Sequence, residues 1–86
     1  MLNTSLSTSD DVIRATLLDL AKQREATFCP SEAARRVADD WRPLMQDVRR
    51  VASRLQRDGF LAATQAGQPV DALSATGPIR LSRPRH

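Results

Sequence analysis

The sequence predicts a mainly α-helical domain that ends in a small β-hairpin. Three segments before residue 59 carry apolar residues at helical spacing, and two short β-prone segments follow it, separated by glycine and proline. With 86 residues the chain fits one domain with a thin core. Such a core leaves little room for a deep substrate pocket of roughly several hundred Å³.

The first helix is predicted over residues 10–23, where Val12, Ile13, Leu17 and Leu20 lie on one face. Thr8, followed three residues later by Asp11, resembles a capping box with aspartate in place of glutamate. We therefore expect residues 1–8 to form a flexible N-terminus and the domain to cover residues 9–81.

A second, short helix is predicted over residues 30–38. Pro30 suits the first helical position, which places Cys29 at the N-cap. Glu32 then occupies the third helical position, where its carboxylate can accept hydrogen bonds from free backbone amides.

The third helix has the strongest pattern in the chain. It follows Asp39 and Asp40 and is expected to end at Gly59. Its apolar residues form a single stripe: Trp41, Leu44, Met45, Val48, Val51, Ala52 and Leu55. Trp41, at the edge of this stripe, is predicted to be a core residue.

A hairpin is predicted after the third helix. Residues 60–65 resemble a strand, residues 66–69 a turn, and residues 79–81 a returning strand after Gly77 and Pro78. Residues 82–86 are expected to form a mobile, basic C-terminal tail. Three helices followed by a hairpin with a long tip make a winged helix-turn-helix.

Three strings in the chain resemble a family of bacterial proteins, the domain of unknown function numbered 3253. They are residues 29–35 (CPSEAAR), residues 41–45 (WRPLM) followed by Val48 and Arg49, and residues 77–80 (GPIR). The resemblance spans nearly the whole chain and implies a winged-helix fold. It implies no catalytic or binding residues.

The charge is unevenly distributed. Residues 1–34 hold three basic and five acidic residues, a net charge of −2, whereas residues 35–86 hold ten basic and five acidic residues, a net charge of +5. A basic half favours anionic partners such as DNA, RNA or acidic protein surfaces, although net charge also serves solubility.

The polar face of the third helix is the main candidate for nucleic-acid binding. In helix-turn-helix proteins arginine reads guanine or contacts phosphate, and glutamine reads adenine. The candidates are Arg42, Gln46, Arg49, Arg50, Ser53 and Arg57. The alternative is a solvated helix face.

Local ion pairs reduce the number of free cations in the predicted helices. Asp47 can pair with Arg50 and Arg54 with Asp58, and Arg35 and Arg36 can pair with Asp39 and Asp40. Arg42, Arg49 and Arg57 have no such partner, so they are expected to be free to meet phosphate or guanine.

Two further candidates lie in the hairpin and the tail. Arg80 and Arg83 can reach phosphate or the minor groove, with a frayed tail as the alternative. No lysine or arginine lies between Phe60 and Ile79, so the tip itself lacks charge for phosphate contact.

Catalytic and metal chemistry find no support in the sequence. One cysteine and one histidine cannot form a disulfide or the usual four-ligand zinc site, and no nucleophile and base occur in a recognisable pattern. We therefore expect no enzyme activity, no cofactor and no metal. The lone cysteine and the absence of a leader or apolar span predict a cytoplasmic protein without membrane contact.

Two functions follow from this reading. The first is a module that binds double-stranded DNA through the third helix and the wing. The alternative is a winged helix that binds itself or another protein through apolar surface around Phe60, Leu61 and Leu73.

Overall fold

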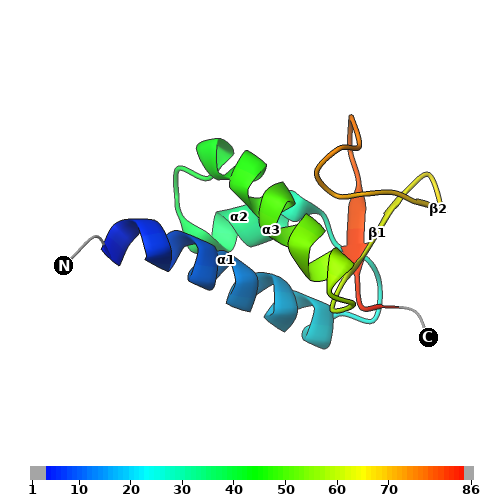
Figure 1. Ribbon diagram of the computed structural model, residues 1–86, viewed down its shortest axis with the longest axis horizontal. Coiled ribbons are helices and arrows are strands. Elements are labelled where there is room, and N and C mark those ends of the chain that lie inside the picture. Colours follow the sequence, from blue (N-terminus) through cyan, green and yellow to red (C-terminus); the bar gives the residue numbers. More distant parts are fainter. Residues whose placement is uncertain (1–3, 85–86) are drawn as a thin grey trace.

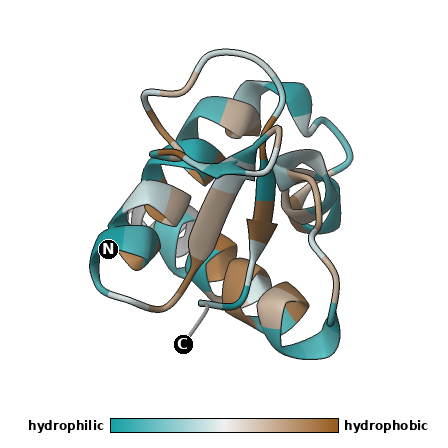
Figure 2. Ribbon diagram, turned by 90° about the vertical axis from the view of Figure 1, so that its right-hand side faces the viewer, coloured by the Kyte–Doolittle hydropathy of each residue, from teal (hydrophilic) through white to brown (hydrophobic). Residues whose placement is uncertain are grey.

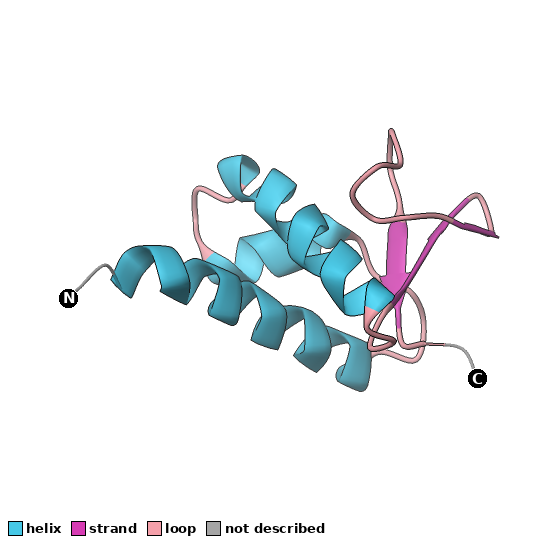
Figure 3. Ribbon diagram, viewed as in Figure 1, coloured by secondary structure: helices cyan, strands magenta, loops and turns pink. Residues whose placement is uncertain are grey.

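The computed structural model describes residues 4–84, with side chains from residue 10 onward. Helix α1 spans Thr4–Gln23, α2 Pro30–Val37 and α3 Met45–Arg57, with a 3₁₀ turn, η1, at Arg42–Leu44. Strands β1 (Ala62–Gln65), β2 (Gln68–Pro69) and β3 (Arg80–Ser82) follow. The helices pack against one another at one end of the molecule, and the strands gather at the other (Figures 1 and 3).

The sheet is antiparallel, with strand order β2-β1-β3. The segment between α1 and α2 joins it, because Phe28 and Leu81 exchange two backbone hydrogen bonds of 2.8 and 2.7 Å. Figure 2 shows the strands in front of the helices when the molecule is viewed from its sheet end. Three helices with this small sheet agree with the predicted winged helix-like fold.

The N-terminal boundary differs from the prediction. Helix α1 begins at Thr4, six residues before the expected start, so Thr8 lies inside the helix and the predicted capping box is wrong. Of the expected flexible segment, residues 4–8 are helical and residues 1–3 lie outside the described residues. The start of α2 is as predicted, with Cys29 at the N-cap and Pro30 as the first helical residue.

The third helix is interrupted near its start. The predicted continuous helix from Trp41 is wrong, because residues 42–44 form a 3₁₀ turn in which the Leu44 amide donates to the Trp41 carbonyl at 2.9 Å. Pro43, which has no N–H to donate, is accommodated in this turn. The end at Gly59 is confirmed: Gly59 has φ +88°, and the Phe60 amide donates to the Leu55 carbonyl at 2.8 Å, as in a Schellman motif.

The hairpin is tighter than predicted. Ala66 and Gly67 alone form the turn, with φ of +52° and +82°, and Gln68 and Pro69 belong to β2. Positive φ at both central residues is the type I′ geometry, whose twist matches that of the flanking strands. The returning strand β3 runs one residue later than predicted, so Ser82 is part of the sheet and not of the tail.

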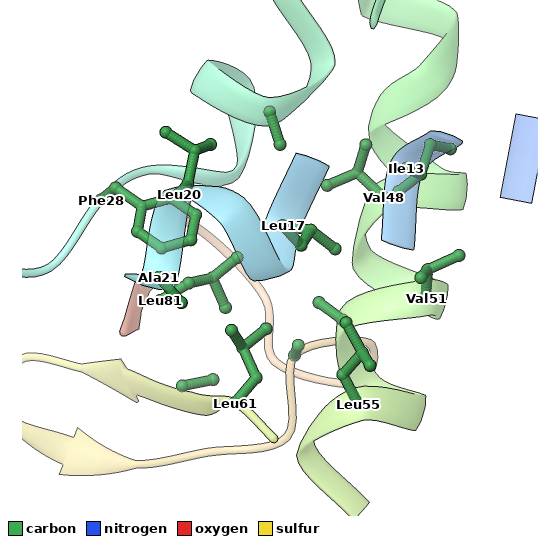
Figure 4. Packing of buried hydrophobic residues seen from close by; sticks show 14 of the residues in the cluster. Ile13, Leu17, Leu20, Ala21, Phe28, Val48, Val51, Leu55, Leu61 and Leu81 are labelled. Carbon is green, nitrogen blue, oxygen red and sulfur yellow. The ribbon is translucent and has the colours of Figure 1, made fainter. Parts of the chain in front are cut away.

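The core lies between the three helices and the sheet (Figure 4). Its largest fully buried side chains come from α1, the Phe28 bridge, α3 and β3: Phe28, Ile13, Leu17, Leu20, Leu55, Leu81 and Val48. The expectation for Trp41 is only partly met, since its ring is half-buried at the edge of this cluster. The guanidinium groups of Arg35 and Arg42 lie 4.6 and 4.8 Å from the centre of the ring.

Candidate nucleic-acid interface

Helix α3 has two polar sides with different surroundings. One side faces residues 70–78, the segment between β2 and β3, which we call the wing loop. The other side carries Gln46, Arg50, Arg54 and Arg57, all exposed and spaced about one helical turn apart. We call these four residues the outer row.

Arg49 binds the wing loop with its whole guanidinium group. Its Nε donates to the Ala72 carbonyl at 2.9 Å, and its two terminal nitrogens donate to the carbonyls of Ala75 at 2.7 Å and Gly77 at 3.3 Å. The expectation that Arg49 is free to meet phosphate or guanine is therefore wrong. Its donors are used to fold the wing loop over α3.

Ser53 extends the same contact. Its side chain is buried, with 4% exposed, and its hydroxyl donates to the Asp71 carboxylate at 2.6 Å. The same carboxylate accepts the backbone amides of Leu73 and Ser74 and the Ser74 hydroxyl. The Ser53 hydrogen bond, followed by the Ser74 bonds, lowers the pKa of Asp71 to about 2. Ser53 is thus covered and does not lie on the solvent-facing side of α3.

Two glutamines complete the attachment of the loop. The Gln56 amide nitrogen donates to the Val70 carbonyl, and its oxygen accepts the Ala72 amide at 3.0 Å. From β1, the Gln65 amide donates to the carbonyls of Thr76 and Pro78. The side chains of Arg49, Gln56 and Gln65 together satisfy backbone groups along most of the wing loop.

The outer row has one partly neutralised member. Arg50 binds Asp10 of α1 at 2.7 Å and Asp47 at 3.3 Å, so the predicted pair with Asp47 is confirmed. The Asp10 carboxylate, and then Asp47, raise the pKa of Arg50, and Arg50 in turn lowers the pKa of Asp10. All three side chains are about half exposed, so these pairs are weak and can rearrange.

The other two arginines of the row, Arg54 and Arg57, form no ion pair with any side chain between residues 10 and 84. The predicted pair of Arg54 with Asp58 is not formed; only the Asp58 amide donates to the Arg54 carbonyl, at 3.0 Å. Gln46, Arg54 and Arg57 are exposed. We therefore add Arg54 to the candidate surface and remove Arg49 and Ser53, which contact the wing loop.

The arginines of α2 and η1 also depart from their predicted pairs. Arg36 binds Asp19 of α1 at 3.7 Å, and Arg35 stacks on Trp41. Among the described side chains, neither pairs with Asp39 or Asp40. Arg42 is exposed and stacks on the same ring, in the 3₁₀ turn that precedes α3.

The two candidates in the hairpin and tail hold backbone segments together. Arg80 donates to the hydroxyl and the carbonyl of Thr27, at 2.9 and 3.1 Å. Arg83 donates to the carbonyls of Ala21 at 3.0 Å and Arg24 at 3.3 Å, near the end of α1. The frayed-tail alternative therefore does not describe Arg83; residues 85 and 86 lie outside the described residues.

Glu32 has a partner that its position in the sequence does not indicate. Its carboxylate binds the guanidinium of Arg24, the residue that follows α1. This ion pair links the end of α1 to the first turn of α2. Arg24, and to a smaller extent the backbone amide of Cys29, lower the pKa of Glu32. The hydrogen bonds of this carboxylate go to Arg24, so its predicted role in capping α2 stays a prediction.

The comparison with known families supports the resemblance noted in the sequence. Residues 10–84 match the model of a family described as "Protein of unknown function (DUF3253)", and the chain belongs to this family. No match was found among curated proteins. In the described part of the chain no helix is long and apolar enough to cross a membrane.

Proposed function

We propose that this domain is a non-enzymatic nucleic-acid-binding module that contacts double-stranded DNA through the outer row of α3. Arg42 extends the contact at the N-terminal end of the row. Arg49 and Ser53 contribute only by positioning the wing loop. Arg80 contributes by holding β3 to the segment after α1, and Arg83 by holding the chain after β3 to the end of α1. No cofactor or metal takes part in this proposal.

The observation that carries the proposal is the exposure of Arg54 and Arg57 beside Gln46 on one face of α3. Arginine can bind guanine or phosphate, and glutamine can bind adenine, when the third helix of a helix-turn-helix lies in the major groove. These side chains contact no carboxylate in the described part of the chain, so they lose no ion pair on binding.

Arg50 can join the contact at small cost. Its pairs with Asp10 and Asp47 are exposed, and pairs of this kind contribute about 0–1 kcal/mol each. A phosphate or a guanine edge replaces them with charge-assisted hydrogen bonds of similar geometry. The carboxylates nonetheless oppose DNA locally, so we expect weak, strongly salt-dependent binding.

A cytoplasmic location fits this proposal. Cys29 is a free, half-exposed thiol, which suits a reducing compartment.

The proposal is tested by duplex titration with matched arginine variants. Arg57→Ala should weaken binding of a random-sequence duplex by roughly 3- to 10-fold at low salt, because one phosphate or base contact is lost. Arg36→Ala is the control, since it removes the same charge from α2, where Arg36 pairs with Asp19. If both variants lose the same duplex affinity, the loss reflects the change in net charge and not a contact made by Arg57.

Protein interaction is the second candidate, and exposed apolar side chains favour it. Phe60 is 51% exposed and Leu73 is 41% exposed. Leu61, which was predicted to lie on the same apolar surface, is 3% exposed and belongs to the core. A parent that binds no duplex at low salt, but binds protein with little salt dependence, would support this candidate instead.

A further inference from the structure

The outward face of α1 carries a short stripe whose charges are arranged symmetrically. Asp11, Ala15, Leu18 and Lys22 recur at steps of four, three and four residues, so they lie within about 60° of one another around the helix. The buried residues of α1, among them Ile13, Leu17 and Leu20, lie on the opposite side. In Figure 1, α1 forms the lower side of the molecule, and no other element crosses beneath it.

The charges that flank this stripe are already used within the molecule. Asp19 binds Arg36 at 3.7 Å and accepts the Gln23 amide at 3.1 Å, and the Arg14 guanidinium lies 5.9 Å from the centre of the Phe60 ring. Asp11 and Lys22, at the ends of the stripe, are exposed and form no ion pair with any described side chain.

The middle of the stripe is apolar and next to a groove. Leu18 and Ala15 line an open depression of about 460 Å³ whose other lining residues are both apolar and charged: Ala21, Phe60, Pro84, Asp19, Lys22 and Arg83. Phe60 is the most exposed large apolar side chain in the described part of the chain, at 51%. An apolar centre between two unpaired, opposite charges is the composition of a small interface.

Antiparallel alignment makes this stripe complementary to itself. Asp11 and Lys22 lie equally far from the midpoint between Thr16 and Leu17, and so do Ala15 and Leu18. When two copies of α1 cross antiparallel at this midpoint, Asp11 of each lies opposite Lys22 of the other. Leu18 of each lies opposite the small Ala15, which lets the helices approach closely. A two-fold axis produces both pairs twice.

We propose that a second copy of this chain binds the α1 stripe, and that two chains form an antiparallel α1–α1 dimer. The dimer buries Ala15, Leu18 and the edge of Phe60, and it pairs Asp11 with Lys22 at both ends. A parallel alignment is disfavoured because it would place Asp11 against Asp11 and Lys22 against Lys22. This inference does not depend on DNA binding and is tested without nucleic acid.

The test is sedimentation equilibrium of the full chain across a wide concentration range. The parent should pass from monomer to dimer. Asp11→Lys and Lys22→Asp should each weaken the dimer at least about tenfold, because each replaces two attractive pairs with two repulsive ones. Asp40→Lys, an exposed position in the turn after α2, is the charge-matched control and should leave the dimer unchanged.

The double variant Asp11→Lys/Lys22→Asp decides the orientation. It restores both pairs in an antiparallel dimer, so its association should return to within about threefold of the parent. A parent that stays monomeric up to about 1 mM would overturn the proposal. So would single variants that dimerise like the parent, or a double variant no better than the single ones. Circular dichroism of each variant checks that the helices are intact.

Discussion

Arg49 and Arg50 are neighbours of the same type, yet the structure gives them opposite surroundings. Arg49 donates to three carbonyls of the wing loop, whereas Arg50 is exposed and binds two half-exposed carboxylates. One step along α3 turns a side chain by about 100°, enough to move it from the loop side to the outer row. Cationic residues of one helix can therefore differ in whether the fold uses their donors.

The largest expected difference between the two sides is in stability. Arg49→Ala leaves three loop carbonyls without their donor and should lower the free energy of unfolding by about 2–3 kcal/mol. Arg50→Ala removes only exposed ion pairs and should cost about 0.5 kcal/mol. Chemical denaturation of both variants measures this difference. Equal costs for the two would show that the wing loop is held without Arg49.

The two sides also differ in how far the sequence could predict them. The helical spacing of apolar residues predicted the buried stripe from Val48 to Leu55 correctly, and Gly59 predicted the end of α3 correctly. Partners were predicted only at three- and four-residue spacing, so Ala72, Ala75 and Gly77, which lie 23 to 28 residues from Arg49, were missed. Such contacts depend on where the chain returns, which no local pattern records.

One signal for the loop side was present in the sequence. A loop of about ten residues has many backbone groups to satisfy, and most need a partner when the loop packs on a helix. Arg49, Ser53 and Gln56 recur at helical spacing next to the apolar stripe, as a second, polar stripe. Together these features favour a helix flank that binds backbone, and they could have separated Arg49 from the outer row.

The loop side should also respond to acid, through the Asp71 carboxylate. The pKa of Asp71 lies at about 2, below its usual 3.8, because Ser53 and the 73–74 segment donate to its carboxylate. Since the folded state holds the deprotonated form, this contribution to stability is full above about pH 4 and is lost as the pH falls toward 2. Asp71→Asn should therefore flatten the loss of thermal stability between pH 4 and pH 2.

The comparison of parent and Asp71→Asn melts isolates this carboxylate from Asp10 and Glu32, whose pKa values are also lowered. Parallel pH profiles for the two proteins would contradict the role of Asp71 as an anchor of the loop.

The smallest expected effect is at the hairpin tip, away from both sides of α3. Ala66 has φ +52°, a left-handed conformation that alanine adopts at a cost and asparagine tolerates better. Ala66→Asn should raise the free energy of unfolding by about 0.5 kcal/mol and leave duplex affinity unchanged. A lower melting temperature would contradict the assignment of residues 66 and 67 to a type I′ turn.

The division between the two sides of α3 is tested most directly by the salt dependence of duplex binding. The slope of log affinity against log salt should be smaller by about 2 in Arg54→Ala/Arg57→Ala than in the parent, because two phosphate contacts are lost. Arg49→Ala, measured where it is fully folded, should keep the parental slope. A parental slope in the double variant, or a parent that binds no duplex at low salt, would contradict the assignment of the outer row to DNA.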